Sequence, residues 1–203
     1  IIVKDYDKYL SPDNDGCKDI LDLRVSTNEF GNIHVQIFDS YNDQLVNELV
    51  KNVIAEQITS FIITGKNIQG SVLRDGDYRI KIIAYDELGN KNETVDNDLI
   101  IDKTNPTIQL VEITNGISPQ NQDSLYDNAS IKLLFDEPVI VSAWLGNYSY
   151  QQRVKLVSDE IVNQNELSIE WDGKDATNNY ISDGKYFLTV KAVDLAGNVV
   201  DVS

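Results

Sequence analysis

The feature that most constrains the fold of this sequence is an internal repeat with a constant offset of 108 residues. Three short motifs recur at this offset without a gap: residues 65–66 match 173–174, residues 75–78 match 183–186, and residues 84–90 match 192–198. A period near 100 residues is too long for a solenoid unit, so each copy is expected to be a domain with its own core. We predict two domains, residues 1–103 and 104–203, joined by a polar stretch around Pro106.

Within each copy the apolar residues recur with a period of two. Leu21, Leu23 and Val25 alternate with polar neighbours, and residues 78–84 and 186–192 follow the same pattern. Such alternation places one face on a core and the other in water, which is typical of antiparallel sheets. Asp-Gly and Gly-Asn turns divide each copy into about seven short strands. The predicted fold is all-β, two tandem immunoglobulin/fibronectin-III-like antiparallel β-sandwiches.

The ends of the copies lead to two further expectations. Tyr78 and Tyr186 follow the Asp-Gly turns, near the start of the penultimate strand, where a tyrosine-corner residue is expected. The strand after Asn198 spans only residues 199–203, so we expect the sequence to end inside or just after its last strand. The N-terminus has neither an initiator Met nor a signal peptide, and we therefore expect a segment of a longer protein.

Composition and charge narrow the class of partner. The chain is 41% hydrophobic and 25% charged, as in soluble globular proteins, and no apolar run approaches the roughly 20 residues that span a bilayer. The net charge is −16, and residues 1–103 carry half of it, with 11 basic and 19 acidic side chains. An even acidic surface repels phosphate groups, which argues against nucleic acid or an anionic membrane as the partner.

Several of the repeated residues resemble a known family. Residues 171–175 (Trp-Asp-Gly-Lys-Asp), 183–186 and 192–198 are similar to the Ig-like domain of the flagellar hook-capping protein, and to modules of bacterial surface proteins and cell-envelope subtilisin-type proteases. Residues 11–19 resemble the opening of such modules. The first copy departs from the pattern at Ile63-Thr64, and the second at residues 118–123. The resemblance implies an Ig-like fold and an extracytoplasmic location, and it implies no single activity.

An Asp-rich loop opens the first copy. Asp13, Asp15 and Asp19 could offer carboxylate oxygens to calcium. Their spacing fits an EF-hand poorly, because Gly16 comes too early and no Glu stands at the twelfth position. Asp side chains in loops more often cap turns through backbone amides, so we assign no metal or other cofactor and leave calcium as a hypothesis. Cys17 is the only cysteine, which excludes an intramolecular disulfide.

Residues suited to catalysis are few. Asp172 and Asp175, with Asp183 nearby, could suggest two-carboxylate glycoside hydrolysis, but they belong to turn motifs and a sandwich of this size seldom has a cleft. His34 is the only histidine and falls on the polar side of an alternating strand, which excludes a site of several His ligands. We therefore expect no enzymatic activity.

The two tryptophans, Trp144 and Trp171, could form an aromatic surface for a ligand. Trp171 aligns with Ile63 and is expected in the core. Trp144 falls on the outward face of its strand with Tyr148 and Tyr150 close by, and exposed Trp and Tyr are enriched at contacts. These three residues are the candidate binding surface, although packing between domains would explain them equally well.

These observations leave three interpretations. The preferred one is a non-catalytic structural or scaffold segment of a larger bacterial surface or periplasmic protein, whose partners are other domains of that protein or neighbouring surface proteins. The second is an adhesion module that binds a carbohydrate or a protein. The third is an accessory segment of a cell-envelope protease.

Overall fold

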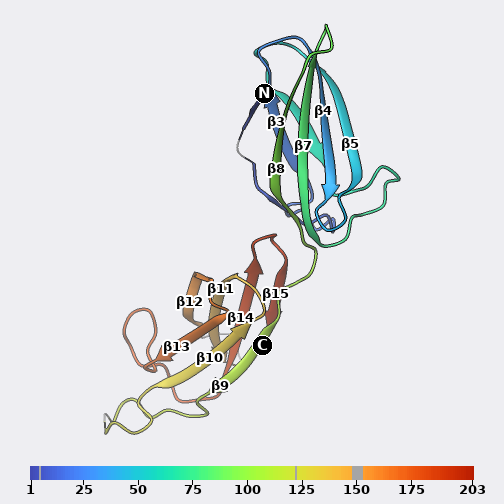
Figure 1. The fold of residues 1–203 in the computed structure, drawn as a ribbon. Coiled ribbons are helices and arrows are strands. Elements are labelled where there is room, and N and C mark those ends of the chain that lie inside the picture. The colour runs from blue at the N-terminus through green and yellow to red at the C-terminus, as the bar shows by residue number, and fades with distance from the viewer. Residues whose placement is uncertain (5, 122, 148–152) are drawn as a thin grey trace. The chain divides into compact units, whose positions relative to one another are not determined.

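A computed structural model gives the fold of the chain and describes residues 1–4, 6–121, 123–147 and 153–203. The chain divides into two compact units, Ile1–Thr104 and Asn105–Ser203 (Figure 1). Strands and no helices occur among these described residues. The predicted all-β fold, with two antiparallel sandwiches in tandem, is confirmed.

The first unit is a sandwich of two sheets. Its strands are β1 (Ile2–Val3), β2 (Tyr9–Leu10), β3 (Leu21–Ser26), β4 (Gly31–Asp39), β5 (Gln44–Val53), β6 (Thr59–Ile63), β7 (Gly76–Asp86) and β8 (Lys91–Ile101). One sheet has the order β1-β3-β6 and the other β2-β8-β7-β4-β5. The pairs are antiparallel except at one edge, where β2 runs parallel to β8 and Leu10 lies opposite Ile101. The N-terminal segment therefore crosses from the first sheet to the second.

Strand β3 illustrates why the alternating pattern folds in this way. Leu21, Leu23 and Val25 are buried, whereas Asp22 and Arg24 lie on the other face and form an ion pair of 2.9 Å between Nε and Oδ2. Burial of each large apolar side chain contributes about 1.5–3 kcal/mol. A shift of the strand by one residue would exchange the two faces, so the alternation fixes the register.

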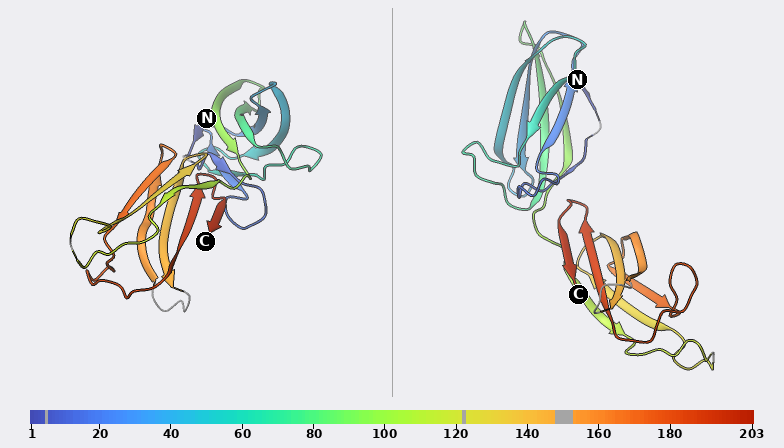
Figure 2. Two further views of the ribbon diagram at one scale, coloured as in Figure 1. Left: turned by 90° about the horizontal axis from the view of Figure 1, so that it is seen from below. Right: turned by 180° about the vertical axis from the view of Figure 1, so that it is seen from behind.

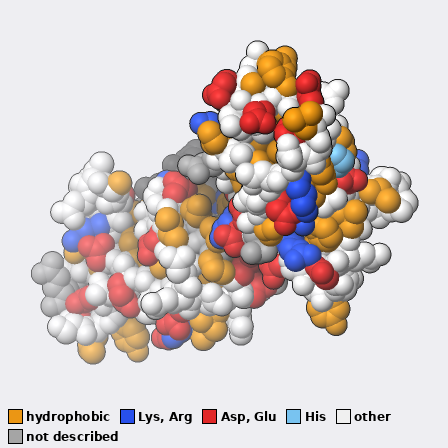
Figure 3. All heavy atoms as spheres, turned by 45° about the horizontal axis from the view of Figure 1, so that its top comes forward, with side chains coloured by type: hydrophobic (Ala, Val, Ile, Leu, Met, Phe, Trp, Pro, Cys, Tyr) orange, Lys and Arg blue, Asp and Glu red, His pale blue; other side chains and the backbone are white. Residues whose placement is uncertain are grey.

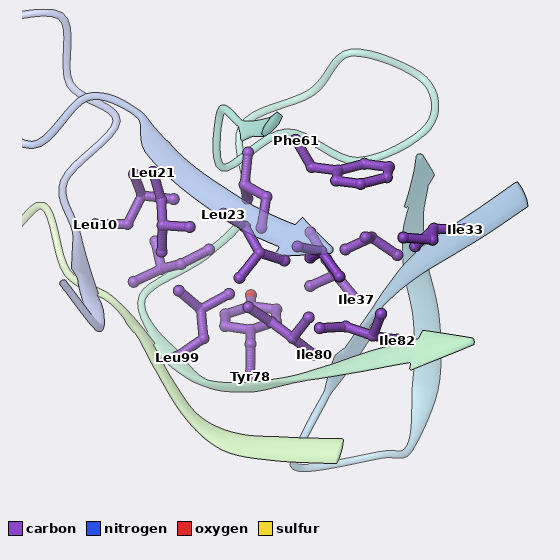
Figure 4. Close-up of a cluster of buried hydrophobic side chains, with 14 of the residues drawn as sticks. Leu10, Leu21, Leu23, Ile33, Ile37, Phe61, Tyr78, Ile80, Ile82 and Leu99 are labelled. Carbon is purple, nitrogen blue, oxygen red and sulfur yellow. The ribbon is translucent and has the colours of Figure 1, made fainter. Parts of the chain in front are cut away.

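The core of the first unit lies between its two sheets and extends from one end to the other. Its buried members are Leu10, Leu21, Leu23, Val25, Ile33, Val35, Ile37, Val53, Phe61, Ile63, Leu73, Tyr78, Ile80, Ile82, Leu99 and Ile101. Figure 4 shows Leu10, Leu21 and Leu99 at one end of this cluster, and Ile33 and Ile82 at the other. Viewed from below, in the left panel of Figure 2, the strands of the first unit are arranged in a ring.

The second unit repeats the arrangement. Its strands are β9 (Ile108–Ile113), β10 (Ala129–Phe135), β11 (Val139–Asn147), β12 (Arg153–Val162), β13 (Glu166–Trp171), β14 (Tyr186–Asp194) and β15 (Val199–Val202). The sheets have the orders β13-β10-β9 and β12-β11-β14-β15. The members of its buried core are Ile131, Leu133, Phe135, Val139, Val141, Ala143, Val157, Val162, Leu167, Ile169, Val190 and Ala192. By the repeat offset, Tyr78 of the first core has its counterpart in Tyr186, which is only half-buried.

Strand β12 is an edge strand and its pairing with β11 is irregular. The register shifts between Val141 and Ala143 and again between Ala143 and Trp144. Asp159 has a φ of +50° at this point. Its backbone N–H donates to Ser142 Oγ at 3.0 Å, and that hydroxyl donates to Asp159 Oδ1 at 2.8 Å. The two side chains hold a β-bulge in place.

The repeated Asp-x-x-Gly-Asn motif forms the turn before the last strand of each unit. Asp86 Oδ1 accepts the backbone N–H of Asn90 at 2.8 Å, and Asp86 Oδ2 accepts its side-chain amide at 2.7 Å. Asp194 and Asn198 make the same two bonds at 2.9 and 2.7 Å. The carboxylate thus satisfies donors that the tight turn leaves without strand partners.

The repeated Ser-Pro and Gly-Lys motifs contact each other in both units. Gly65 has a φ of +62°, and a Cβ there would lie 2.6 Å from Pro12 Cγ; Gly173 has a φ of +81°, and a Cβ there would lie 2.5 Å from Pro119 Cγ. Only glycine provides both the backbone conformation and the space for the proline ring. These motifs therefore recur because they build the fold.

The two tyrosines that follow the Asp-Gly turns make equivalent bonds. Tyr78 donates its hydroxyl to the carbonyl of Arg74 at 2.9 Å, and Tyr186 donates to the carbonyl of Ser182 at 2.9 Å. Each bond spans four residues back along the chain, which is the geometry of a tyrosine corner.

Candidate functional site

The Asp-rich loop of the first unit brings its three carboxylates together. Oxygens of Asp13, Asp15 and Asp19 all lie within 4.8 Å of one another. Backbone N–H groups already donate to each of them: Gly16 N to Asp19 Oδ2 at 2.9 Å, Asp15 N to Asp13 Oδ1 at 3.1 Å, and Cys17 N to Asp15 Oδ1 at 2.7 Å. The carboxylates thus form turns, as the sequence indicated.

These hydrogen bonds are compatible with a bound cation but do not require one. Calcium takes six to eight oxygen ligands, and a carboxylate oxygen that accepts one backbone N–H keeps a second lone pair. Asp13 and Asp15 are exposed and Asp19 is half-buried, so the group is open to solvent. The donor set suits a hard cation such as calcium, and backbone carbonyls or water would have to complete its coordination.

The predicted aromatic surface lies only partly within the described residues. Trp144 is in β11, between the buried Ala143 and Leu145, and its side chain is half-buried on the opposite face of the strand. Tyr148 and Tyr150 lie outside the described residues.

Two of the carboxylates considered for hydrolysis, Asp172 and Asp175, have lowered pKa values. The pKa of Asp172 is lowered by its hydrogen bond with Lys174, whose ammonium lies 3.1 Å away. The pKa of Asp175 is lowered by hydrogen bonds from Thr177 and Asn179. A general acid in glycoside hydrolysis needs a raised pKa, so neither group is prepared to donate a proton. Asp183 is exposed.

His34 lies on the solvent side of β4 beside the neighbouring strand β5. Its Nδ1 is 3.0 Å from Glu48 Oε1, and Gln36 donates to the same oxygen at 2.9 Å. Its ring meets that of Tyr85 edge-on at a centroid distance of 5.3 Å. These contacts form a cross-strand polar network on the sheet surface. Figure 3 shows this histidine among acidic, basic and apolar side chains on the face of the first unit.

A pocket that sequence reasoning missed opens at one end of the second unit. Its volume is about 530 Å³, and its walls come from the end of β9, the start of β10 and β14, and the end of β13. Aromatic and apolar side chains line it, among them Trp171, Tyr180, Ile181 and Tyr186. Its volume falls within the range of ligand-binding pockets, and its lining is mixed, since Asn115, Gln120 and Asp183 also contribute to it.

The position of Trp171 corrects the expectation that it belongs to the core. Ile63, its counterpart, is 2% exposed, whereas Trp171 is half-buried at the end of β13 and forms a wall of the pocket. Its indole Nε1–H donates to the carbonyl of Lys174 at 2.8 Å. An indole N–H that is removed from water needs such an acceptor. The turn at Gly173 places the Lys174 carbonyl where it can accept this hydrogen bond.

Comparison with known proteins gives likenesses among solved structures only. No protein family matches the chain, and neither does any curated protein. A tetra-tandem repeat from the extending region of a large adhesion protein is 20% identical, with a TM-score of 0.39 over 91% of this chain and 44% of that one. A 1.5-MDa bacterial ice-binding adhesin is 15% identical, with a TM-score of 0.47 over 99% and 62%.

A third likeness is to a Ca²⁺-stabilised adhesin of an Antarctic bacterium, 15% identical with a TM-score of 0.36 over 90% of this chain and 42% of that one. The chain spans less than two thirds of the length of each of these structures. At these identities and TM-scores the likenesses carry no argument about what this chain does. No membrane-spanning helix is found in the described part of the chain.

Proposed function

We propose that this chain is a pair of non-catalytic Ig-like modules that serve as a structural spacer in a larger extracytoplasmic bacterial protein. The proposal is supported by the use of the repeated residues. The Asp86–Asn90 turn, the Gly65–Pro12 contact and the tyrosine corner of Tyr78 all stabilise the fold, and each recurs in the second unit. A module that acts as a spacer needs a stable fold, so the residues that recur in it are expected to be those that stabilise the fold.

The observation that carries the proposal is the pairing of the terminal segments of the first unit. Strands β2 and β8 are parallel, and Ile100 N donates to the carbonyl of Lys8 at 2.8 Å while Asp102 N donates to that of Leu10 at 3.0 Å. Tension along the chain pulls two such strands in opposite directions, so their hydrogen bonds are loaded in shear and share the force. An antiparallel pair pulled from one end would instead lose its bonds one at a time.

Force spectroscopy on the full chain tests this load-bearing role. Ile100→Pro removes the N–H that donates to Lys8, whereas Ile100→Ala keeps the N–H and loses most of the same side chain. Unfolding of each unit should lengthen the chain by roughly 300 Å. We expect the Pro variant to lower the unfolding force of one of the two events well below that of the Ala variant. Equal forces in the two variants would show that β2 and β8 do not bear the load.

Adhesion to a carbohydrate or a protein is the alternative. Trp144 favours it, because a large aromatic side chain lies partly exposed on the outer face of a sheet. Trp144→Ala should weaken binding in a glycan or surface-protein array while the thermal midpoint changes little. An unchanged binding profile would exclude this surface.

A cation in the Asp-rich loop would stiffen the first unit. Calorimetry of the full chain with millimolar calcium or with chelator tests it, and Asp15→Ala and Asp98→Ala serve as the loop variant and its exposed acidic control. We expect the midpoint of the first unit to rise with calcium in the control and not in the loop variant. The same midpoint with calcium and with chelator would leave these carboxylates as turn formers alone.

An accessory role beside a protease domain is the third candidate. The sequence of the full-length protein tests this candidate, because the accessory role requires a Ser-His-Asp peptidase domain in the same polypeptide.

A further inference from the structure

Strand β5 forms one edge of the larger sheet of the first unit, and its outer side is open along most of its length. Figure 1 shows β5 at the border of that sheet, with β4 as its neighbour. In the ranges that the structure describes, β5 pairs with β4 alone, and the register has no shift from Asn47 to Val53. β12, its counterpart in the second unit, has two such shifts. The edge of β5 is therefore regular where that of β12 is interrupted.

The hydrogen bonds of the sheet identify the backbone groups that point outward from β5. Ser40 N donates to the carbonyl of Asp77 at 3.1 Å, so the even-numbered residues of β4 bond with β7 and the odd-numbered ones with β5. The partners of those odd-numbered residues are the odd-numbered residues of β5. Because backbone direction alternates along an antiparallel strand, the N–H and C=O groups of three residues point away from the sheet: Glu48, Val50 and Asn52.

The usual protection of an edge strand is missing here. Glu48 N donates to Asn47 Oδ1 at 2.7 Å, but no strand of the described chain lies beyond Val50, whose side chain is 52% exposed. Outward lysines often guard such edges, yet Lys51 turns its ammonium to the carbonyl of Ser60 at 2.6 Å, toward the other sheet. Over the described residues 47–53 the edge therefore has neither a bulge nor an outward lysine.

The open stretch of the edge has a defined length. At one end Ile68 N donates to the carbonyl of Val46 at 3.0 Å, so the loop after β6 already occupies the edge there. At the other end β5 ends at Val53, and Ile54 begins a turn in which Gln57 N donates to its carbonyl at 3.1 Å. A strand that spans residues 47–53 of a second copy fits between these limits.

We propose that β5 pairs antiparallel with β5 of a second copy of this chain, about a two-fold axis beside Val50. This self-association does not depend on the spacer role. In a two-fold contact the same surface must complement itself. Val50 lies opposite Val50 of the second copy, and the two exposed apolar side chains cover each other. Glu48 lies opposite Asn52 of the second copy and offers the amide its Oε2, since His34 and Gln36 contact Oε1.

Other registers of the same pairing are less complementary. Outward groups recur at every second residue, so the neighbouring two-fold axes lie beside Leu49 and Lys51. The axis beside Lys51 places two ammonium side chains opposite each other, which destabilises a pair. The axis beside Leu49 places Asn52 opposite Val46, whose carbonyl Ile68 already bonds. The axis beside Val50 matches apolar with apolar and amide with carboxylate.

Disulfide trapping on the full chain tests this register. Cys17 is the only cysteine, so Cys17→Ser gives a background without thiols. Opposite residues in an antiparallel pair have Cα atoms about 4.5–5.5 Å apart, which a disulfide can span. Val50→Cys should cross-link about tenfold faster than Asn92→Cys, an exposed control in β8. A mixture of Glu48→Cys and Asn52→Cys chains should give mainly the mixed disulfide. Equal rates, or a statistical mixture of products, would overturn the proposal.

Sedimentation equilibrium measures the pairing without a cross-link. The net charge of −16 on each chain opposes association, so we expect the dimer fraction to rise with salt. Val50→Pro removes an outward N–H that β4 does not use, whereas Val50→Thr keeps it. We expect the Pro variant to stay monomeric at concentrations where the Thr variant forms dimers, with circular dichroism showing that both are folded. The same dimer fraction in both variants would contradict pairing through this edge.

A charge exchange at position 52 provides a matched control. Asn52→Lys places an ammonium opposite Glu48 of the second copy and should strengthen the dimer about fivefold, whereas Asn52→Glu should weaken it by a similar factor. Asn92→Lys and Asn92→Glu change the net charge equally on β8, which β7 and β4 separate from β5, and should act less. Equal effects at both positions would overturn the proposal. So would an edge that binds an unrelated extended peptide while the chain stays monomeric.

Discussion

Leu99→Ala is the perturbation that best tests how the first unit closes its core. The side chain is fully buried in β8, opposite Tyr78. The substitution removes three carbon atoms, whose transfer from water contributes about 0.8 kcal/mol each, or roughly 2.4 kcal/mol together. The cavity that is left raises the cost further, so we expect a loss of about 3–4 kcal/mol in the free energy of unfolding.

Urea unfolding followed by two signals measures this loss. Both tryptophans are in the second unit, so their fluorescence reports that unit, whereas far-UV circular dichroism reports both. Because each unit has its own core, Leu99→Ala should lower the urea midpoint of the first unit alone. The change should therefore appear in the circular dichroism and not in the tryptophan fluorescence. Leu88→Ala, in a turn of the same unit and 90% exposed, is the matched control and should change stability by less than about 0.5 kcal/mol.

Two results would refute this reasoning. A loss below about 1 kcal/mol would mean that neighbouring side chains collapse into the space, and that Leu99 does not close the core. An equal shift of the tryptophan transition would mean that the two units unfold together.

Three further predictions concern the same unit. Gly65→Ala should cost about 1–3 kcal/mol, because of the positive φ and the contact with Pro12, and an unchanged urea midpoint would contradict that strain. Tyr78→Phe should cost about 1 kcal/mol by removing the bond to the Arg74 carbonyl, which a thermal melt would detect. Hydrogen bonds from Arg74 lower the pKa of Asp39, so this carboxylate stabilises the fold above its unfolded pKa of about 4 and loses that effect as pH falls through the folded value. Asp39→Asn should therefore be less stable than the original chain at pH 7, and the difference should shrink in acid; an undiminished difference at pH 2 would contradict the assignment.

The sequence predicted the parts of the fold that depend on local chemistry. The alternation of Leu21, Leu23 and Val25 identified a strand and its buried face, because side-chain direction in a strand follows directly from position. The Asp86–Asn90 motif identified a turn, because the bonds that hold it span only a few residues. The two tyrosine corners were expected for the same reason.

The parts that depend on distant segments could not be predicted. The parallel pair of β2 and β8 involves two residues of each strand, too few for a recognisable pattern. Trp171 was expected in the core because it aligns with Ile63, but its burial depends on how segments distant in the sequence pack around the end of β13.

The bulge in β12 affects whether neighbouring modules can pair with each other through their edge strands. An exposed, regular edge strand offers a row of N–H and C=O groups on which another chain can aggregate. The positive φ of Asp159, held by its bonds with Ser142, interrupts that row in the second unit. Tandem copies keep similar strands at high local concentration, where mispairing between neighbouring modules leads to swapped and aggregated forms. Replacing Ser142 would thus endanger solubility before it affected the fold, and the irregular edge acts as a safeguard against fibril-like assembly.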